Sequence, residues 1–207
     1  MFEVDHLVYA TPDVDRTIDE LEQVLGVRAA PGGQHPAWGT RNALLSLGPR
    51  TYLEIFGPDP RALEPPQPRP LGLDDLKQAR LVTWVAPHSD LDRLVLEASR
   101  HKIDLGLVET RSRQRPDGTT LEWRMTDPRK SRIDGIVPFF IDWGDAPHPA
   151  ENAPSGCRLL GLRAEHPLAV EVEPLIKGLG IELPLTRGNA PLLVAALETP
   201  RGTIELR

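Results

Sequence analysis

An internal repeat is the feature that most constrains how this chain folds. The segment Asp-Val-Asp-Arg at residues 13–16 recurs as Asp-Leu-Asp-Arg at residues 90–93, which is 77 residues later. In both copies an alternating, strand-like stretch precedes the segment, at residues 4–10 and 81–86. A run with apolar residues at helical spacing follows it, so an aspartate stands where a helix N-cap is expected. The repeat predicts one strand-helix unit that is used more than once.

Each predicted helix is followed by strand-like segments with turn residues between them. In the first copy these segments are 42–47 and 51–56. In the second copy a Pro-Asp-Gly turn at 116–118 precedes a strand-like segment, and residues 136–143 form the closing strand. A third, more divergent copy begins at residues 158–163. The sequence therefore predicts a β-α-β-β-β unit that occurs two to three times along the chain.

The units are expected to share one fold. We predict a single domain over residues 1–207, with modules at about 3–57 and 80–143 and a degenerate third module at 157–207. The proline-rich stretches 58–70 and 146–155 join these modules and are expected to be irregular.

Composition narrows the range of partners. The chain is 40% hydrophobic and 26% charged, which is ordinary for a globular domain, and no apolar run is long enough for a membrane helix. The net charge is −6 and the basic residues are scattered, so neither nucleic acid nor a membrane is an expected partner. Cys157 is the only cysteine, which excludes an internal disulfide and favours a reducing compartment, the cytoplasm.

Several stretches resemble one known family. They are Asp5–Ala10, Gly32–Leu45, Tyr52–Ile55, Arg115–Gly118 and Pro138–Gly144. Over roughly residues 4 to 180 the chain resembles the glyoxalase-like proteins of the vicinal-oxygen-chelate superfamily. The resemblance implies an α+β fold in which repeated βαβββ modules form a curved mixed sheet, a cup of the glyoxalase and dihydroxybiphenyl dioxygenase kind with its helices outside. It also implies a small-molecule site in the cup and, as in many members, a homodimer.

The resemblance marks His6 and Glu54 as metal ligands. Metal-using members bind a divalent ion with a His on the first strand and a Glu on the last strand of one module, and with equivalents from the partner module. Imidazole with carboxylate suits Zn, Ni, Mn or Fe(II) and leaves positions open for substrate. Strand alternation allows both side chains to face the cup. The alternative stays open that His6 only makes a hydrogen bond within the core and Glu54 pairs with an arginine.

The second module departs from the metal-binding pattern. Thr83, a poor ligand, stands 77 residues after His6. Asp142 and Glu205 are the candidates for a further carboxylate: Asp142 as a catalytic group with Glu54, and Glu205 as a third ligand because its setting echoes that of Glu54. If neither approaches the pair, an ion would have two protein ligands and bind weakly. That outcome favours a metal-free binding protein.

The segment at residues 35–42 is predicted to form a lip over the substrate. Its candidate substrate-binding residues are His35, Trp38 and Asn42. Trp38 would cover an apolar ligand, and Asn42, with donor and acceptor groups, would fix a polar one. The alternative is a loop held in place by a tryptophan that packs on the end of the barrel.

The strand-like segment at residues 120–125 offers two faces. Trp123 shares one face with apolar residues, and Arg124 shares the other with Glu122. Trp123 is a candidate wall of the binding site. An inward Arg124 would bind an anionic substrate, and a surface salt bridge is the alternative. His88, His101, His148 and His166 are all predicted to face solvent.

Two functions follow from these residues. The first is a divalent-metal-dependent lyase, isomerase or dioxygenase, in which the ion polarises substrate oxygens and a carboxylate transfers a proton. The second is a metal-free small-molecule or drug-binding protein that sequesters its ligand, with tryptophans as apolar walls. No nucleotide-binding or serine-hydrolase motif occurs in the sequence.

Overall fold

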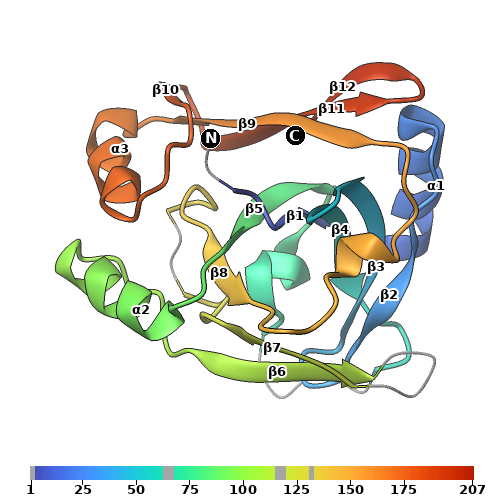
Figure 1. Cartoon of the computed structure of the whole chain (residues 1–207). Helices are drawn as coiled ribbons and strands as arrows, with labels where there is room; N and C mark the ends of the chain where they lie inside the picture. The colour runs from blue at the N-terminus through green and yellow to red at the C-terminus, as the bar shows by residue number, and fades with distance from the viewer. Residues whose placement is uncertain (1–2, 63–67, 115–119, 131–132) are drawn as a thin grey trace.

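Three β-α-β-β-β units follow one another along the chain, as the repeat predicts (Figure 1). The computed structural model describes residues 3–62, 68–114, 120–130 and 133–207, so the predicted turn at 116–118 lies outside the described residues. The first unit holds β1 (His6–Ala10), α1 (Val14–Leu25), β2 (Ala30–His35), β3 (Thr40–Gly48) and β4 (Thr51–Pro58). The second holds β5 (Arg80–Pro87), α2 (Leu91–Arg100), β6 (Glu109–Gln114), β7 (Thr120–Met125) and β8 (Phe139–Asp142). The third holds β9 (Arg158–His166), α3 (Ala169–Gly178), β10 (Leu185–Arg187), β11 (Leu192–Thr199) and β12 (Gly202–Leu206), and the short 3-10 helices η1 (Pro70–Asp75) and η2 (Pro149–Glu151) lie in the linkers.

The repeated Asp-x-Asp-Arg segment starts the first two helices in the same way. The Asp13 carboxylate accepts a hydrogen bond from the backbone N–H of Arg16, and Asp90 accepts the corresponding bond from Arg93. Each aspartate satisfies a backbone donor that the first helical turn leaves without a partner. Helix α1 ends at Gly26, whose φ of 79° favours glycine. The 77-residue repeat therefore reproduces the N-cap hydrogen bond as well as the amino-acid sequence.

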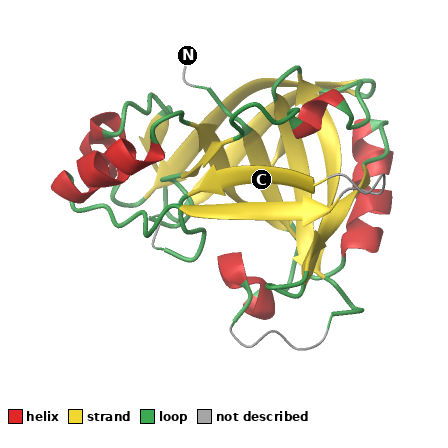
Figure 2. Ribbon diagram, turned by 60° about the horizontal axis from the view of Figure 1, so that its bottom comes forward, coloured by secondary structure: helices red, strands yellow, loops and turns green. Residues whose placement is uncertain are grey.

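The first two units form one curled sheet of eight strands in the order β2-β3-β4-β1-β5-β8-β7-β6. Strands β1 and β5 pair antiparallel at its centre, and each pairs in parallel with the last strand of its own unit, β4 or β8. Edge strands β2 and β6 contact each other. The sheet is therefore curved into a cup, and Figure 2 shows this curvature. This arrangement confirms the predicted α+β class and curved mixed sheet.

Alternation along β1 divides the core between the two faces of this sheet. Leu7 is buried in a cluster on the outer face with residues of α1 and α2, whereas Val8 and Ala10 belong to a second cluster on the concave face. On β5, Trp84 is fully buried in the outer cluster, and its indole N–H donates to the Ile136 carbonyl at 3.0 Å. On each strand, the residues that alternate with those of the outer face therefore point into the interior of the cup.

The third unit keeps the order β-α-β-β-β but pairs its strands differently. It forms a separate sheet, β10-β9-β11-β12, in which β9 lies between β10 and β11. Leu162, Ala195 and Leu197 of this sheet join the outer core cluster together with α1 and α2. In Figure 1 β9, β11 and β12 run along one side of the molecule between α3 and α1. The third unit therefore covers the outer face of the large sheet and stands away from the interior of the cup.

Candidate functional site

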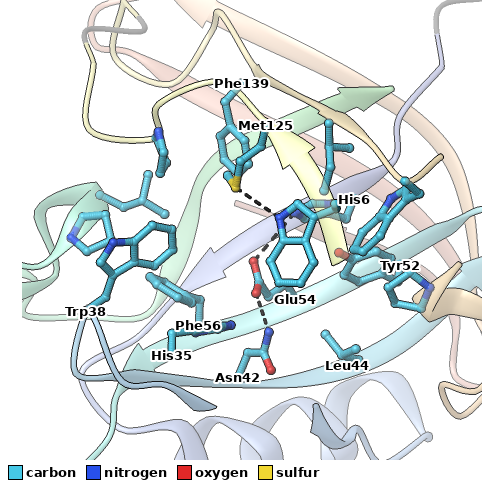
Figure 3. A pocket seen from close by; sticks show the side chains of 17 residues that line it. His6, His35, Trp38, Asn42, Leu44, Tyr52, Glu54, Phe56, Met125 and Phe139 are labelled. Carbon is cyan, nitrogen blue, oxygen red and sulfur yellow. Dashed lines mark hydrogen bonds and ion pairs between the residues drawn. The ribbon is translucent and has the colours of Figure 1, made fainter. Parts of the chain in front are cut away.

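A cavity of about 70 Å³ opens on the concave face of the large sheet. Most of its lining is aromatic or aliphatic, and Figure 3 shows these side chains converging on one central carboxylate, that of Glu54. The lining residues are His6, His35, Trp38, Asn42, Leu44, Tyr52, Glu54, Phe56, Pro70, Leu71, Trp123, Met125, Pro128, Phe139, Ile141, Trp143 and Pro149. The polar groups come mainly from β1, β3 and β4 of the first unit, and the second unit supplies apolar side chains.

Asp5, directly before β1, anchors the polar side of the cavity. Its Oδ1 lies 2.6 Å from His6 Nδ1, and its Oδ2 accepts hydrogen bonds from Trp143 Nε1 at 2.9 Å and His148 Nε2 at 3.1 Å. The side chain is only 2% exposed. Burial alone would raise the pKa of Asp5, but the hydrogen bonds from His148 and His6 lower it from 3.8 to about 2. Asp5 is therefore ionised at neutral pH.

The hydrogen bonds also decide where the imidazole protons lie. His148 Nδ1 accepts from the backbone N–H of Ala150 at 3.2 Å, so its proton is on Nε2, which donates to Asp5. His6 Nδ1 likewise faces an ionised carboxylate and is the donor in that pair. The remaining nitrogen of His6, Nε2, therefore points into the cavity with a lone pair when the ring is neutral.

Glu54 on β4 faces His6 across the cavity floor. Its Oε1 accepts a hydrogen bond from Asn42 Nδ2 at 2.5 Å, and its Oε2 lies 3.8 Å from His6 Nε2. The Tyr52 ring stacks on the His6 ring with centroids 4.5 Å apart, which fixes the imidazole plane. We refer to Asp5, His6, Asn42 and Glu54 as the polar cluster. The gap between His6 and Glu54 is too long for a direct hydrogen bond, so both atoms can bind a third group.

The structure brings together most of the predicted site residues. His6 and Glu54 share the cavity with His35, Trp38 and Asn42 from the predicted lip and with Trp123 from β7. The lip is built on two paired strands, since β2 and β3 pair antiparallel with His35 opposite Thr40. Trp38 stands in the tight connection between them.

Arg124 lies outside the cavity, so its predicted role in binding an anionic substrate is wrong. Trp123 and Met125 line the cavity, and alternation directs Arg124 to the opposite face. There its guanidinium donates to Asp92 of α2 at 2.7 Å and is 43% exposed. The surface ion pair that the sequence left open is the arrangement observed.

Neither candidate for a third carboxylate approaches His6 and Glu54. Asp142 stands between Ile141 and Trp143, which line the cavity, and its Oδ1 accepts from the backbone N–H of Gly144. Glu205 lies on β12, at the edge of the separate sheet, and pairs with Arg163 and Arg207. The expected equivalence of Glu205 with Glu54 fails because β12 pairs with β11, whereas β4 pairs with the first strand of its own unit.

Strand register identifies the true counterparts of the pair in the second unit. Glu54 lies opposite Val8, and the residue opposite Val85, the repeat equivalent of Val8, is Phe139. Thr83, the equivalent of His6, is fully buried and donates to the Gly135 carbonyl. The second unit therefore has a hydroxyl and a phenyl ring where the first has an imidazole and a carboxylate.

Comparison with known proteins agrees with this architecture. Residues 4–180 match a family described as glyoxalase-like domain. The chain belongs to the glyoxalase-like domain family, within the vicinal-oxygen-chelate superfamily. A search of curated proteins found no match to it.

Two solved structures illustrate how far the likeness extends. A hypothetical protein from Staphylococcus aureus superposes with a TM-score of 0.65 at 12% identity, covering 98% of this chain and 83% of that one. Methylmalonyl-CoA epimerase from Mycobacterium tuberculosis superposes with a TM-score of 0.43 at 17% identity, covering 70% of this chain and 88% of that one. The first likeness shows a shared fold that includes the third unit.

The donor set of this glyoxalase-like cup does not fit a tightly held divalent ion. Catalytic metal sites in proteins usually have three protein ligands, and here His6 Nε2 and Glu54 Oε2 are the donors that face each other. Within residues 3–62, 68–114, 120–130 and 133–207, no group of three or more His, Cys, Asp or Glu side chains is placed to hold a metal ion. One oxygen of Glu54 is also engaged by Asn42. The residues present therefore do not fit a metal-dependent chemical step.

Two of the four histidines that were expected to face solvent are buried. His148 is fully buried because its proline-rich linker folds against β3 and β4, and His166 is 5% exposed and pairs with Asp134 at 3.1 Å. His88 is half-buried and His101 is exposed. The His-Pro sequence at 148–149, which starts the helix η2, is the local feature that could have indicated an ordered His148. Asp5, the hydrogen-bond partner of His148, is distant in the sequence.

Asp5, Phe139 and Trp143 were not singled out as polar-cluster or register partners by the sequence. Each acts through a contact between residues that are distant in the sequence, such as the Trp143 indole that donates to Asp5. Among the described residues, no helix is both long and apolar enough to cross a membrane.

Proposed function

We propose that this glyoxalase-like chain binds a small organic molecule in its cup without a resident metal ion. The observation that carries the proposal is the lining of the cavity: aromatic and aliphatic walls surround one small polar cluster. Ligand pockets in proteins have this composition, with most of the surface apolar and a few polar groups that orient the ligand.

The walls supply the affinity. Trp123 and Trp143 lie with ring centroids 5.4 Å apart, and the Phe139 ring stands edge-on to His6 at 5.9 Å. Burying about 150 Å² of apolar ligand surface against such rings contributes about 4 kcal/mol before the cost of association. Binding through the walls alone is therefore of modest affinity.

The polar cluster supplies the orientation. Glu54 Oε2 is an acceptor, and His6 Nε2 is an acceptor when the ring is neutral. A ligand group that donates hydrogen bonds or carries positive charge is favoured between them. The hydrogen bond from Asn42 holds Glu54 in place, and the stacked Tyr52 ring holds His6.

Metal-independent proton transfer is a second candidate function, and the Asp5–His6 pair favours it. An ionised carboxylate that accepts from Nδ1 stabilises the imidazolium formed when Nε2 takes a proton from a ligand. Exchange of the α-protons of phenylacetone in D2O, followed by NMR, tests this function. Acceleration that His6→Gln removes supports it, and equal exchange with and without protein contradicts it.

The indole N–H signals of the four tryptophans test the proposed function. Trp38, Trp123 and Trp143 line the cavity, whereas Trp84 is buried in the outer core and serves as an internal control. Benzyl alcohol, a small neutral aromatic probe, is titrated into chelator-treated, 15N-labelled protein. We expect the three cavity signals to shift saturably while the Trp84 signal stays in place. Unchanged cavity signals, or shifts that require added metal, would overturn the proposal.

A further inference from the structure

We propose that the ligand of this cup is an organic cation, with a compact quaternary or protonated amine head group seated against Glu54. This inference rests on the proposed function, because it names the class of molecule that the same cavity selects. It follows from the charge of the polar cluster, from the aromatic faces around it and from the size of the cavity.

The polar cluster is negatively charged whether or not His6 is protonated. Asp5 and Glu54 contribute two carboxylates, and neutral His6 leaves both unbalanced. Protonated His6 offsets one of them. His148 adds no positive charge, since its Nδ1 accepts from Ala150 and its Nε2 donates to Asp5. A buried charge without a counter-ion is unfavourable, so a bound cation completes the cluster.

The described part of the chain does not supply that cation itself. None of the described residues that line the cavity is a lysine or an arginine. The Arg111 guanidinium, which is not part of the cavity lining, lies 5.0 Å from the centre of the Trp38 ring and pairs with Glu109. Arg124 is directed outward to Asp92. An anionic ligand would therefore meet the Glu54 carboxylate without a compensating positive charge.

The aromatic walls suit a cation as well as an apolar group. Trp38, Phe56, Trp123, Phe139 and Trp143 all line the cavity. Figure 3 shows Trp38, Phe56 and Phe139 around Glu54. The face of an aromatic ring attracts a cation, and several rings around a carboxylate are the usual way in which proteins bind quaternary ammonium groups. His35, which lies beside Trp38 and Phe56, hydrogen-bonds Thr40 at the rim.

The size of the cavity limits the head group. Because a single water already needs at least about 10 to 15 Å³, a cavity of about 70 Å³ encloses a group of only a few heavy atoms. A trimethylammonium group or a small protonated amine is of this size. The structure therefore assigns the cup to a compact cationic group rather than to a large planar ring system.

Choline and its uncharged carbon isostere, 3,3-dimethylbutan-1-ol, give the sharpest test. The two molecules have the same shape and differ in charge, and 3,3-dimethylbutanoate adds an anion with the same branched group. Calorimetry gives each Kd, and the indole signals report where each molecule binds. We expect choline to bind about tenfold or more tightly than the alcohol, and the anion to bind more weakly than either.

Two charge-matched variants assign the effect to Glu54. Glu54→Gln should reduce choline affinity about tenfold more than it reduces affinity for the uncharged alcohol, whereas Glu122→Gln, which removes an exposed charge on β7, should change neither. An unshifted Trp84 signal shows that each variant is folded. Equal affinity for choline and the alcohol, or no effect of Glu54→Gln, would overturn the cation inference. If benzyl alcohol still shifts the cavity signals, the proposed function survives that result; if no probe shifts them, both fail.

Discussion

The first and second units of the large sheet have the same topology and unequal chemistry. The first unit places Asp5 and His6 where the repeat places Val82 and Thr83 in the second, and it places Glu54 where strand register places Phe139. One half of the cup therefore carries the polar cluster, and the other half carries aromatic wall. The difference shows how a repeated scaffold can lose a symmetric ligand set and retain a binding cavity.

Removing the anchor of the polar half should have the largest effect. Asp5→Ala leaves buried donors on His6, His148 and Trp143 without an acceptor, and we expect it to lower the free energy of unfolding by about 3 to 5 kcal/mol. Urea unfolding measures this change. Asp145→Ala removes an exposed aspartate that lies in the sequence between Trp143 and His148, two partners of Asp5, and is the matched control. Equal stability of the two variants would contradict the role given to Asp5.

Acid should weaken the polar half through the same residue. The pKa of Asp5 is depressed in the folded state, from 3.8 to about 2, so its contribution to stability is fully present above about pH 4 and is lost as the pH falls through about 2. The shift corresponds to about 2 kcal/mol. Comparing the pH dependence of unfolding in wild type and Asp5→Asn isolates this contribution. Parallel curves for the two proteins would show that Asp5 titrates normally.

Giving the apolar half a metal ligand should raise the affinity of the cup for a divalent metal ion. Phe139→Glu places a carboxylate at the register equivalent of Glu54, where the native ring lies 5.9 Å from His6. We expect Zn²⁺ to bind this variant about tenfold or more tightly than it binds wild type, because a third ligand completes the donor set. Phe139→Gln, which is similar in size to Glu and carries no charge, is the control. Equal Zn²⁺ affinity in the two variants would refute the register argument.

Arg124→Ala should have the smallest effect on the cup. The side chain pairs with Asp92 on the outer surface, so we expect probe affinities and the cavity indole signals to match those of wild type. The titrations described for choline and benzyl alcohol measure this. A loss of affinity for either probe would mean that Arg124 acts on the cavity.

The sequence predicted the repeated units and much of the polar half because both depend on local pattern. The Asp-x-Asp-Arg caps predicted where the first two helices begin. The family resemblance marked His6 and Glu54 as site residues, and strand alternation allowed both side chains to face the cup. Alternation alone did not show which face of β7 is exposed to solvent, so it could not decide the position of Arg124. The deciding contact is the ion pair with Asp92 of α2, which is distant in the sequence.

The remaining features depend on long-range pairing that short patterns do not encode. Glu205 has a local sequence like that of Glu54, but the pairing of β12 with β11 carries it to another sheet. Asp5 meets His148 and Trp143 only when the linker folds back against β3 and β4. Strand register identifies Phe139 as the counterpart of Glu54. That register depends on the pairing of β8 with β5, which no short sequence pattern encodes.

The metal content of the purified protein tests the central claim most directly. Elemental analysis is made on protein produced in medium supplemented with Zn, Ni, Mn and Fe and dialysed without chelator. A cup whose polar half offers His6 and Glu54, and whose other half offers Thr83 and Phe139, should retain far less than one equivalent of any of these metals. About one equivalent of a single metal in wild type, lost in Glu54→Gln, would contradict the account.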